Sequence, residues 1–212
     1  MNYLLILLSC LFSLCTFAYP SHWWGPTELN EPAPKWEVLP EQGEMGKTLI
    51  LSKRNELGVL SNFASTPFLF KNKHYASLEG FWQAMKYPEG INDNRYGADL
   101  LPYTRGQVEQ MVSFEAKKAG SLASKLMKKH GIKWVSFDGE KMIYRDPSKG
   151  KHYQLIRAAM KEKLLQNPSV KKILLNTGNL ILRADHKTSK NDPPAWKYYN
   201  IWMEERAMLQ SK

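Results

Sequence analysis

Three polar side chains near the middle of the chain have residue types and a spacing that could do chemistry. Glu79, Gln83 and Lys86 occupy positions i, i+4 and i+7, so on an α-helix they would share one stripe of the surface. A carboxylate and an amine in one pocket could act as an acid or base and as a nucleophile or a phosphate ligand. A solvated helix face has the same pattern, and the spacing alone leaves both interpretations open.

A short helix must carry this stripe. It is predicted to begin near Ser77 and to stop before Pro88, because the residue preceding a proline is pushed out of the helical region. An apolar face at helical spacing supports the prediction. Its members are Leu78, Phe81, Trp82 and Met85.

The remaining patterns predict a helix-dominated α+β fold with small hairpins in a single domain. Residues 134–137 and 141–144 flank Asp138-Gly139, which is a strong signal for a two-residue hairpin turn. A long helix over 107–130 is expected to be broken near Gly120. The other expected elements are a strand at 48–53, a hairpin at 68–70 and 74–76, helices at 152–166 and 169–176, and a last helix beginning at Pro194.

The first 18 residues predict a secretory signal peptide. Residues 3–17 form an apolar run that is shorter than the about 20 apolar residues needed to span a bilayer. The run ends in Thr16-Phe17-Ala18, and a small residue at this place is typical of a cleavage site. Cleavage after Ala18 predicts a secreted or periplasmic protein with no stable membrane insertion. An uncleaved N-terminal anchor is the alternative.

The cysteines and histidines exclude several kinds of site. Both cysteines, Cys10 and Cys15, lie inside the apolar run. The mature chain would therefore lack thiol catalysis, disulfides and cysteine-ligated zinc. The five histidines form no i, i+4 pair, and no carboxylate cluster has the spacing of metal ligands. The sequence thus predicts no metal site and no cofactor.

Composition predicts an irregular arm at 19–46 followed by one folded domain at 47–210. The arm is rich in Pro, Trp and Glu, and could wrap the domain through Trp23, Trp24 and Trp36. A hydrophobic content of 43% argues against disorder. Thirty basic and 20 acidic residues give a net charge of +10, which favours anionic partners such as phosphates, nucleic acid or a membrane surface.

The segment around the polar stripe resembles the signature of the NADAR (YbiA-like) family of N-glycosidases. The matching residues, in order, are Ser61, Asn62, Phe63, Glu79, Phe81, Trp82, Gln83, Ala84, Lys86 and Tyr87. The chain departs from the family at Gly80, where a histidine is usual. Looser matches extend the resemblance over roughly residues 49–208. A YbiA-like fold is therefore expected.

The resemblance implies a hydrolase that cuts the N-glycosidic bond between ribose and a base in a phosphorylated substrate, either an ADP-ribose or a phosphoribosyl compound. The expected partner is thus a nucleotide-like small molecule or an ADP-ribosylated base, with nucleic acid as a further candidate. Glu79 is the expected carboxylate at the developing positive charge, and Lys86 is either a nucleophile or a phosphate contact. The expected substrate-binding residues are Ser61, Asn62, Phe63, Trp82, Gln83, Trp134 and Arg183.

The C-terminal part of the signature matches poorly. Arg183 stands near the position of a family glutamate, and Asp185 follows two residues later. Because side chains alternate along an extended strand, Asp185 could project on the same side and serve as the second catalytic acid. Otherwise the second acid has been lost, and Arg183 could bind phosphate instead.

Two other functional classes compete with the enzyme. The chain could be a non-catalytic ADP-ribose or nucleic-acid binding module of the cell envelope, or a basic envelope protein without a small ligand. The enzyme hypothesis makes a geometric prediction that the others do not. Glu79 and Lys86 should line one pocket with Asn62 and Trp82, and Asp185 should approach it from the C-terminal side.

Overall fold

Helices dominate the computed structural model, which describes residues 19–28 and 32–211. The helices are α1 (Leu78–Ala84), α2 (Arg105–Glu109), α3 (Ser113–Lys129), α4 (Lys151–Gln166), α5 (Pro168–Asn176) and α6 (Tyr198–Gln210). The strands are β1 (Thr48–Ile50), β2 (Phe68–Phe70), β3 (Lys73–Tyr75), β4 (Trp134–Phe137), β5 (Glu140–Ile143) and β6 (Ile181–Arg183). Short 3-10 helices are η1 (Ser21–Trp24), η2 (Pro40–Gln42), η3 (Glu56–Leu60) and η4 (Pro194–Trp196). The predicted helix-dominated α+β fold is confirmed, while the expected signal peptide lies outside the described residues.

The strands form two hairpins and one long-range pair. β2 pairs with β3 and β4 with β5, both antiparallel, whereas β1 pairs with β6 in parallel. Both hairpin turns have left-handed backbone, with φ of 50° and 61° at Lys71 and Asn72 and of 55° and 77° at Asp138 and Gly139. Such turns match the twist of the flanking strands. The two predicted hairpins are confirmed, each with its second strand beginning one residue earlier than expected.

The expected break of the long helix at Gly120 is wrong. The chain leaves the helical conformation after Glu109, and α3 begins at Ser113, which has a φ of 53°. Gly120 lies inside α3, where it faces a side chain of α1. Its role is therefore close packing and not helix termination.

Two other element ends also differ from expectation. Pro194 opens the 3-10 helix η4, and α6 begins only at Tyr198. The strand expected over 48–53 ends at Ile50, because its partner β6 ends at Arg183.

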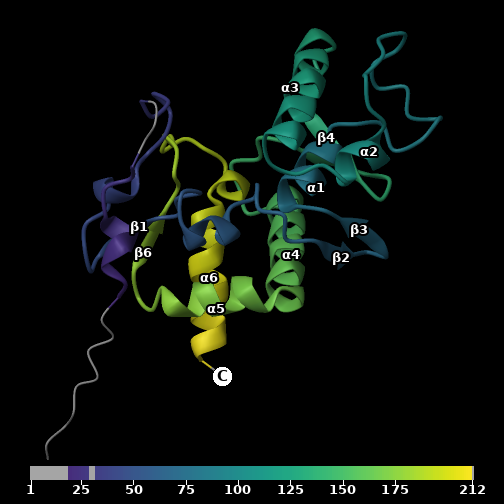
Figure 1. Ribbon diagram of the computed structural model, residues 1–212. Helices are drawn as coiled ribbons and strands as arrows, with labels where there is room; N and C mark the ends of the chain where they lie inside the picture. The colour runs from purple at the N-terminus through teal and green to yellow at the C-terminus, as the bar shows by residue number, and fades with distance from the viewer. Residues whose placement is uncertain (1–18, 29–31, 212) are drawn as a thin grey trace, which may run out of the picture.

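Figure 1 shows α4 and α6 upright in the middle of the molecule, with α5 crossing below them. α3 projects at the upper right, above α1 and α2, and the β1–β6 pair lies at the left beside the N-terminal arm. Trp23 and Trp24 of the arm are buried, whereas Trp36 is 40% exposed. Within residues 19–28 and 32–211, no helix is both long and apolar enough to cross a membrane.

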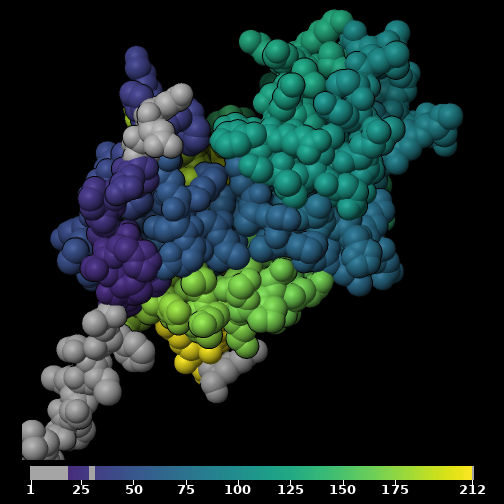
Figure 2. Space-filling model, viewed as in Figure 1, coloured from purple at the N-terminus to yellow at the C-terminus, as the bar shows by residue number. Residues whose placement is uncertain are grey.

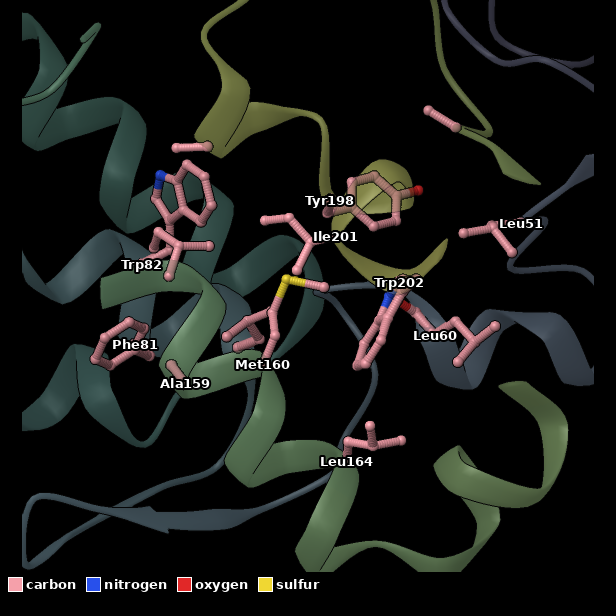
Figure 3. Close-up of a cluster of buried hydrophobic side chains, with 14 of the residues drawn as sticks. Leu51, Leu60, Phe81, Trp82, Ala159, Met160, Leu164, Tyr198, Ile201 and Trp202 are labelled. Atoms are coloured by element: carbon pink, nitrogen blue, oxygen red, sulfur yellow. The ribbon is translucent and has the colours of Figure 1, made fainter. Parts of the chain in front are cut away.

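The main core is built where α4 meets α6. Met160 of α4 lies near Ile201 and Trp202 of α6, and all three are fully buried (Figure 3). Two buried donors from these helices also hold the chain that follows η3. The Nζ of Lys163 donates to the Ser61 carbonyl at 2.7 Å, and the indole of Trp202 donates to the Leu60 carbonyl at 2.7 Å.

α1 is buried along its whole length. All seven of its residues are buried, and the Ser77 hydroxyl caps its start by accepting from the Gly80 amide at 2.9 Å. Gly80 sits against the backbone after α2: a Cβ there would lie 2.6 Å from the Met111 carbonyl oxygen. Neither alanine nor the histidine usual in the NADAR family fits this position.

Gly80→Ala should therefore lower the free energy of unfolding by about 1–3 kcal/mol, the range for overpacking a core. Gly106→Ala is the matched control, because a Cβ at that helical glycine would meet nothing within 4 Å. The control should be neutral or slightly stabilising. Urea denaturation of both variants tests this, and equal stabilities would refute the steric argument.

Candidate functional site

A cavity of about 1070 Å³ lies between α1, α3, the arm and the segment after β6. In Figure 2 a notch separates the arm at the left from the α3 region at the upper right. Eight residues proposed from the sequence line the cavity: Ser61, Asn62, Phe63, Glu79, Trp82, Gln83, Lys86 and Asp185. Segments distant in the sequence thus bring most of the expected site together.

Glu79 and Lys86 reach the cavity from the two ends of α1. Lys86 lies just past the helix, in a turn closed by a 3.1 Å hydrogen bond from its amide to the Gln83 carbonyl. Its ammonium donates to the Ser124 hydroxyl at 2.9 Å and lies 4.8 Å from the centre of the Tyr144 ring. Both charged side chains are buried, with residue exposures of 7% for Glu79 and 4% for Lys86. A solvated helix face, the alternative for this stripe, is therefore excluded.

Gln83 bridges the stripe to α3. Its Nε2 donates to Oε1 of Glu79 at 2.8 Å, while its own Oε1 is buried without a hydrogen-bond partner. This amide packs against Gly120, where a Cβ would lie 1.7 Å from the Gln83 Oε1. The absence of a side chain at Gly120 makes room for the orienting contact on Glu79.

Burial shifts the pKa values of the two charged groups in opposite directions. Burial raises the pKa of Glu79, and the Gln83 hydrogen bond and the Lys86 charge offset only part of this. Burial lowers the pKa of Lys86 to about 8, against the attraction of Glu79. Burial thus shifts each group toward its neutral form.

The 61–63 segment closes the cavity opposite Lys86. The Asn62 carbonyl accepts from the Glu79 amide at 2.9 Å, which joins this segment to the first turn of α1. The side-chain Oδ1 of Asn62 is buried and has no hydrogen-bond partner. Since buried polar atoms are normally paired, Asn62 and Gln83 each present an acceptor that a ligand hydroxyl or N–H could satisfy.

Asp185 enters the cavity by a different route from the one expected. β6 ends at Arg183, and Ala184 and Asp185 are both buried, so strict alternation does not continue to Asp185. The carboxylate forms an ion pair with Lys53 and a 3.2 Å contact with the His186 ring. Burial alone would raise its pKa, but His186 and Lys53 outweigh burial and hold the pKa below the ordinary value. The ionised form of Asp185 is thus favoured, whereas burial disfavours the ionised form of Glu79.

Trp82 forms one aromatic wall. Its indole donates to the Tyr144 hydroxyl at 3.2 Å. The Tyr144 ring packs against Trp196, with 5.3 Å between the two ring centres. Burial raises the pKa of Tyr144 to about 12, so this hydroxyl stays protonated. Tyr144 follows β5 directly, and no motif or spacing indicates that it reaches the site.

Two of the expected binding residues lie elsewhere. Trp134 packs between Arg95 and Lys141, at 4.6 Å and 4.3 Å from its ring centre, and lines a separate surface hollow. Arg183 is exposed on β6, because its neighbour Leu182 faces the core. The prediction that Trp134 and Arg183 bind the substrate in this cavity is therefore wrong.

Several residues that line the cavity are not among those predicted from the sequence. Lys53, Lys117 and Trp36 all line the cavity mouth. Lys117 lies in residues 115–120 (Glu-Ala-Lys-Lys-Ala-Gly), one of the looser matches to the NADAR signature, and this match is the one signal that pointed to it. In the part of the chain that the structure describes, no group of histidine, cysteine, aspartate and glutamate could hold a metal ion.

Comparisons with known proteins do not assign this chain to a family. No family model matches the sequence, and no curated protein matches it. A solved structure, the NMR structure of the E. coli protein YbiA, is similar over 80% of this chain and 89% of that chain, with 18% sequence identity and a TM-score of 0.45. At these values the likeness does not identify a function.

Lys163, which holds the 61–63 segment, makes stability depend on pH. Burial lowers its pKa from 10.5 to about 7, so between these values the unfolded chain binds a proton that the folded chain has released. The free energy of unfolding should therefore rise with pH across this window, by up to about 1.4 kcal/mol per unit.

Lys163→Met should reduce the rise of the unfolding free energy with pH without abolishing it. Burial also lowers the pKa of Lys86, so Lys86 contributes to the same rise. Lys161→Met is the control, because Lys161 is exposed on the same helix. Denaturation series between pH 6 and pH 10 measure the slope. Identical slopes for both variants and the parent protein would contradict the assignment to Lys163.

Proposed function

We propose that the cavity is the active site of an N-glycosidase that hydrolyses the bond between ribose and a base in a phosphorylated, ADP-ribose or phosphoribosyl, substrate. One observation carries the proposal: Glu79 and Lys86 are buried in a single cavity, and burial favours the neutral form of each. Perturbed acids and bases in a cleft are typical of active sites. The resemblance of the 61–87 segment to the NADAR signature supplies the reaction class.

Glu79 is the proposed general acid. Departure of the base breaks the C1′–N bond and leaves the electron pair on the base, which must then gain a proton. The raised pKa of Glu79 supports a protonated carboxyl that can deliver it. The Gln83 amide orients this carboxyl through its 2.8 Å hydrogen bond.

Lys86 is the proposed nucleophile, and Asp185 the proposed stabiliser of positive charge. An unprotonated lysine can attack C1′ as the C1′–N bond to the base breaks, and the new amine then loses a proton. Opening of the C1′–O4′ bond, with a proton passing to O4′, gives an imine, which water hydrolyses to release the sugar and the free lysine. With a pKa of about 8, a useful fraction of Lys86 is the free amine near neutral pH. Asp185 stays ionised and can stabilise the oxocarbenium-like charge on the ribose.

The main competing function is a non-catalytic module that binds ADP-ribose. The lysines at the cavity mouth favour it, because they would attract a phosphorylated ligand whether or not a bond is cut. For either function we propose a secreted or periplasmic location, which depends on the signal peptide expected at residues 1–18.

Glu79→Gln and Lys86→Met should each lower the turnover number at least about 100-fold. Neither should lose stability near pH 7, because each change replaces a buried group whose ionised form burial disfavours. Chromatographic release of the base from ADP-ribosylated guanosine, ribosylamino-pyrimidines and NAD gives the activity, and thermal melting gives the stability.

Lys161→Met serves again as the exposed control and should keep full activity. Ligand binding that survives in Glu79→Gln while turnover vanishes supports the enzyme. Binding by the parent protein with no turnover of any of these substrates would instead establish the binding module.

The pH dependence separates the two roles of Lys86. If its free amine attacks the sugar, kcat/KM should rise about tenfold per pH unit on approaching pH 8 from below. Lys86→Arg keeps the cation but has no free amine at this pH, so it should be inactive. Reduction with borohydride during turnover should add the mass of the sugar to the parent protein. An active Lys86→Arg variant without any adduct would make Lys86 a phosphate contact.

A further inference from the structure

Three aromatic rings and two lysines gather at the solvent-exposed side of the cavity. The Lys117 ammonium lies 5.3 Å from the centre of the Trp36 ring, 5.8 Å from that of Phe63 and 5.9 Å from that of Phe114. Lys53 lies 6.0 Å from Trp36 and 5.1 Å from Phe63. The arm, the 61–63 segment and α3 all contribute to this cluster.

The two lysines differ in their charge partners. Lys53 is paired with the buried carboxylate of Asp185. Lys117 forms no ion pair within residues 19–28 and 32–211, and its ammonium lies near three aromatic rings. Rings hold a cation in place without cancelling its charge. Lys117 is therefore a positioned positive charge that can bind an anion.

Trp36 combines an open face with a fixed backbone. Its carbonyl accepts from the Lys187 amide at 3.0 Å, and the Val38 amide donates to the Asp185 carbonyl at 2.9 Å. Glu37, between them, forms two 2.7 Å hydrogen bonds with the Arg54 guanidinium. The side chain nevertheless stays 40% exposed. An aromatic ring fixed in this way can stack on another planar ring at little entropic cost.

The cavity is also larger than a ribose and one base require. Its volume of about 1070 Å³ lies above the roughly 300–1,000 Å³ usual for small-molecule sites. The space between Lys86 and the mouth can therefore hold more of a ligand than the reacting sugar.

We propose that Trp36 and Lys117 form a second binding subsite, which holds a phosphate and the planar ring attached beyond it. The proposal rests on the proposed function only in placing the reacting ribose near Glu79 and Lys86. Lys117 contacts the phosphate, and Trp36 stacks on the distal ring with Phe63 beside it. The ligand is then a ribose joined through a diphosphate to a nucleoside, and not a single phosphoribosyl unit.

Calorimetric titration with two probes tests the subsite. ADP-ribose reaches both ends of the cavity, whereas ribose 5-phosphate lacks the distal nucleoside. Trp36→Ala and Lys117→Met should each weaken ADP-ribose binding by roughly tenfold, the size of one stacking or cation contact. Trp36→Ala should leave ribose 5-phosphate binding within about twofold, and Trp36→Phe should restore most of the ADP-ribose affinity.

Lys125→Met is the matched control, because Lys125 is exposed on α3 and does not line the cavity. Thermal melting checks that every variant folds. Three results would each overturn the subsite. Trp36→Ala could weaken the binding of both probes equally, it could weaken the binding of neither, or the parent protein could fail to bind ADP-ribose.

The binding readout separates this proposal from the catalytic one. Binding that depends on Trp36 without any turnover would refute the N-glycosidase and keep the subsite. In the opposite case, turnover depends on Glu79 while Trp36→Ala and Lys117→Met bind and turn over the substrate as the parent protein does. That result would refute the subsite and keep the N-glycosidase.

Discussion

The complete burial of α1 is the constraint on which the rest of the structure depends. A helix of seven residues cannot be stable alone, so α2, α3 and α4 must enclose it. Because α1 is enclosed, two positions at its contacts with neighbouring segments have no room for a side chain. Gly80 of α1 and Gly120 of α3 occupy these positions. It also leaves the polar side chains of α1 only one direction in which to project, the cavity.

Burying the ionisable side chains of α1 lowers the free energy of unfolding, and the apolar core must offset this loss. Burial disfavours the ionised forms of Glu79 and Lys86, which costs free energy in the folded state. The apolar contacts between α4 and α6, with Trp202 fully buried among them, provide the opposing free energy. Destabilising groups at a functional centre, supported by a dense core elsewhere, are the usual balance in enzymes.

Local signals made part of this structure predictable. Asp138-Gly139 specified its hairpin turn, and the spacing of Glu79 and Lys86 marked a polar stripe on a short helix. Trp134 is expected in the site from the resemblance alone, and a loose match does not reveal that its ring lies near Arg95 and Lys141 instead. Gly120 looked like a helix breaker, since the sequence does not reveal that Gln83 packs against it. Trp36 and Lys117 meet only through the tertiary fold, so no spacing rule could have paired them.

The parallel pairing of β1 with β6 has a consequence for the order in which the molecule can be assembled. Thr48 aligns with Ile181, and Asp185 follows only a few residues later. During synthesis, Glu79 and Lys86 therefore emerge long before the acid that completes their cavity. Because such distant contacts form slowly, a chain truncated ahead of β6 can enclose α1 and still have no finished centre. Competence depends on β6 and the residues directly after it, which confines any chemistry here to chains synthesised beyond Asp185.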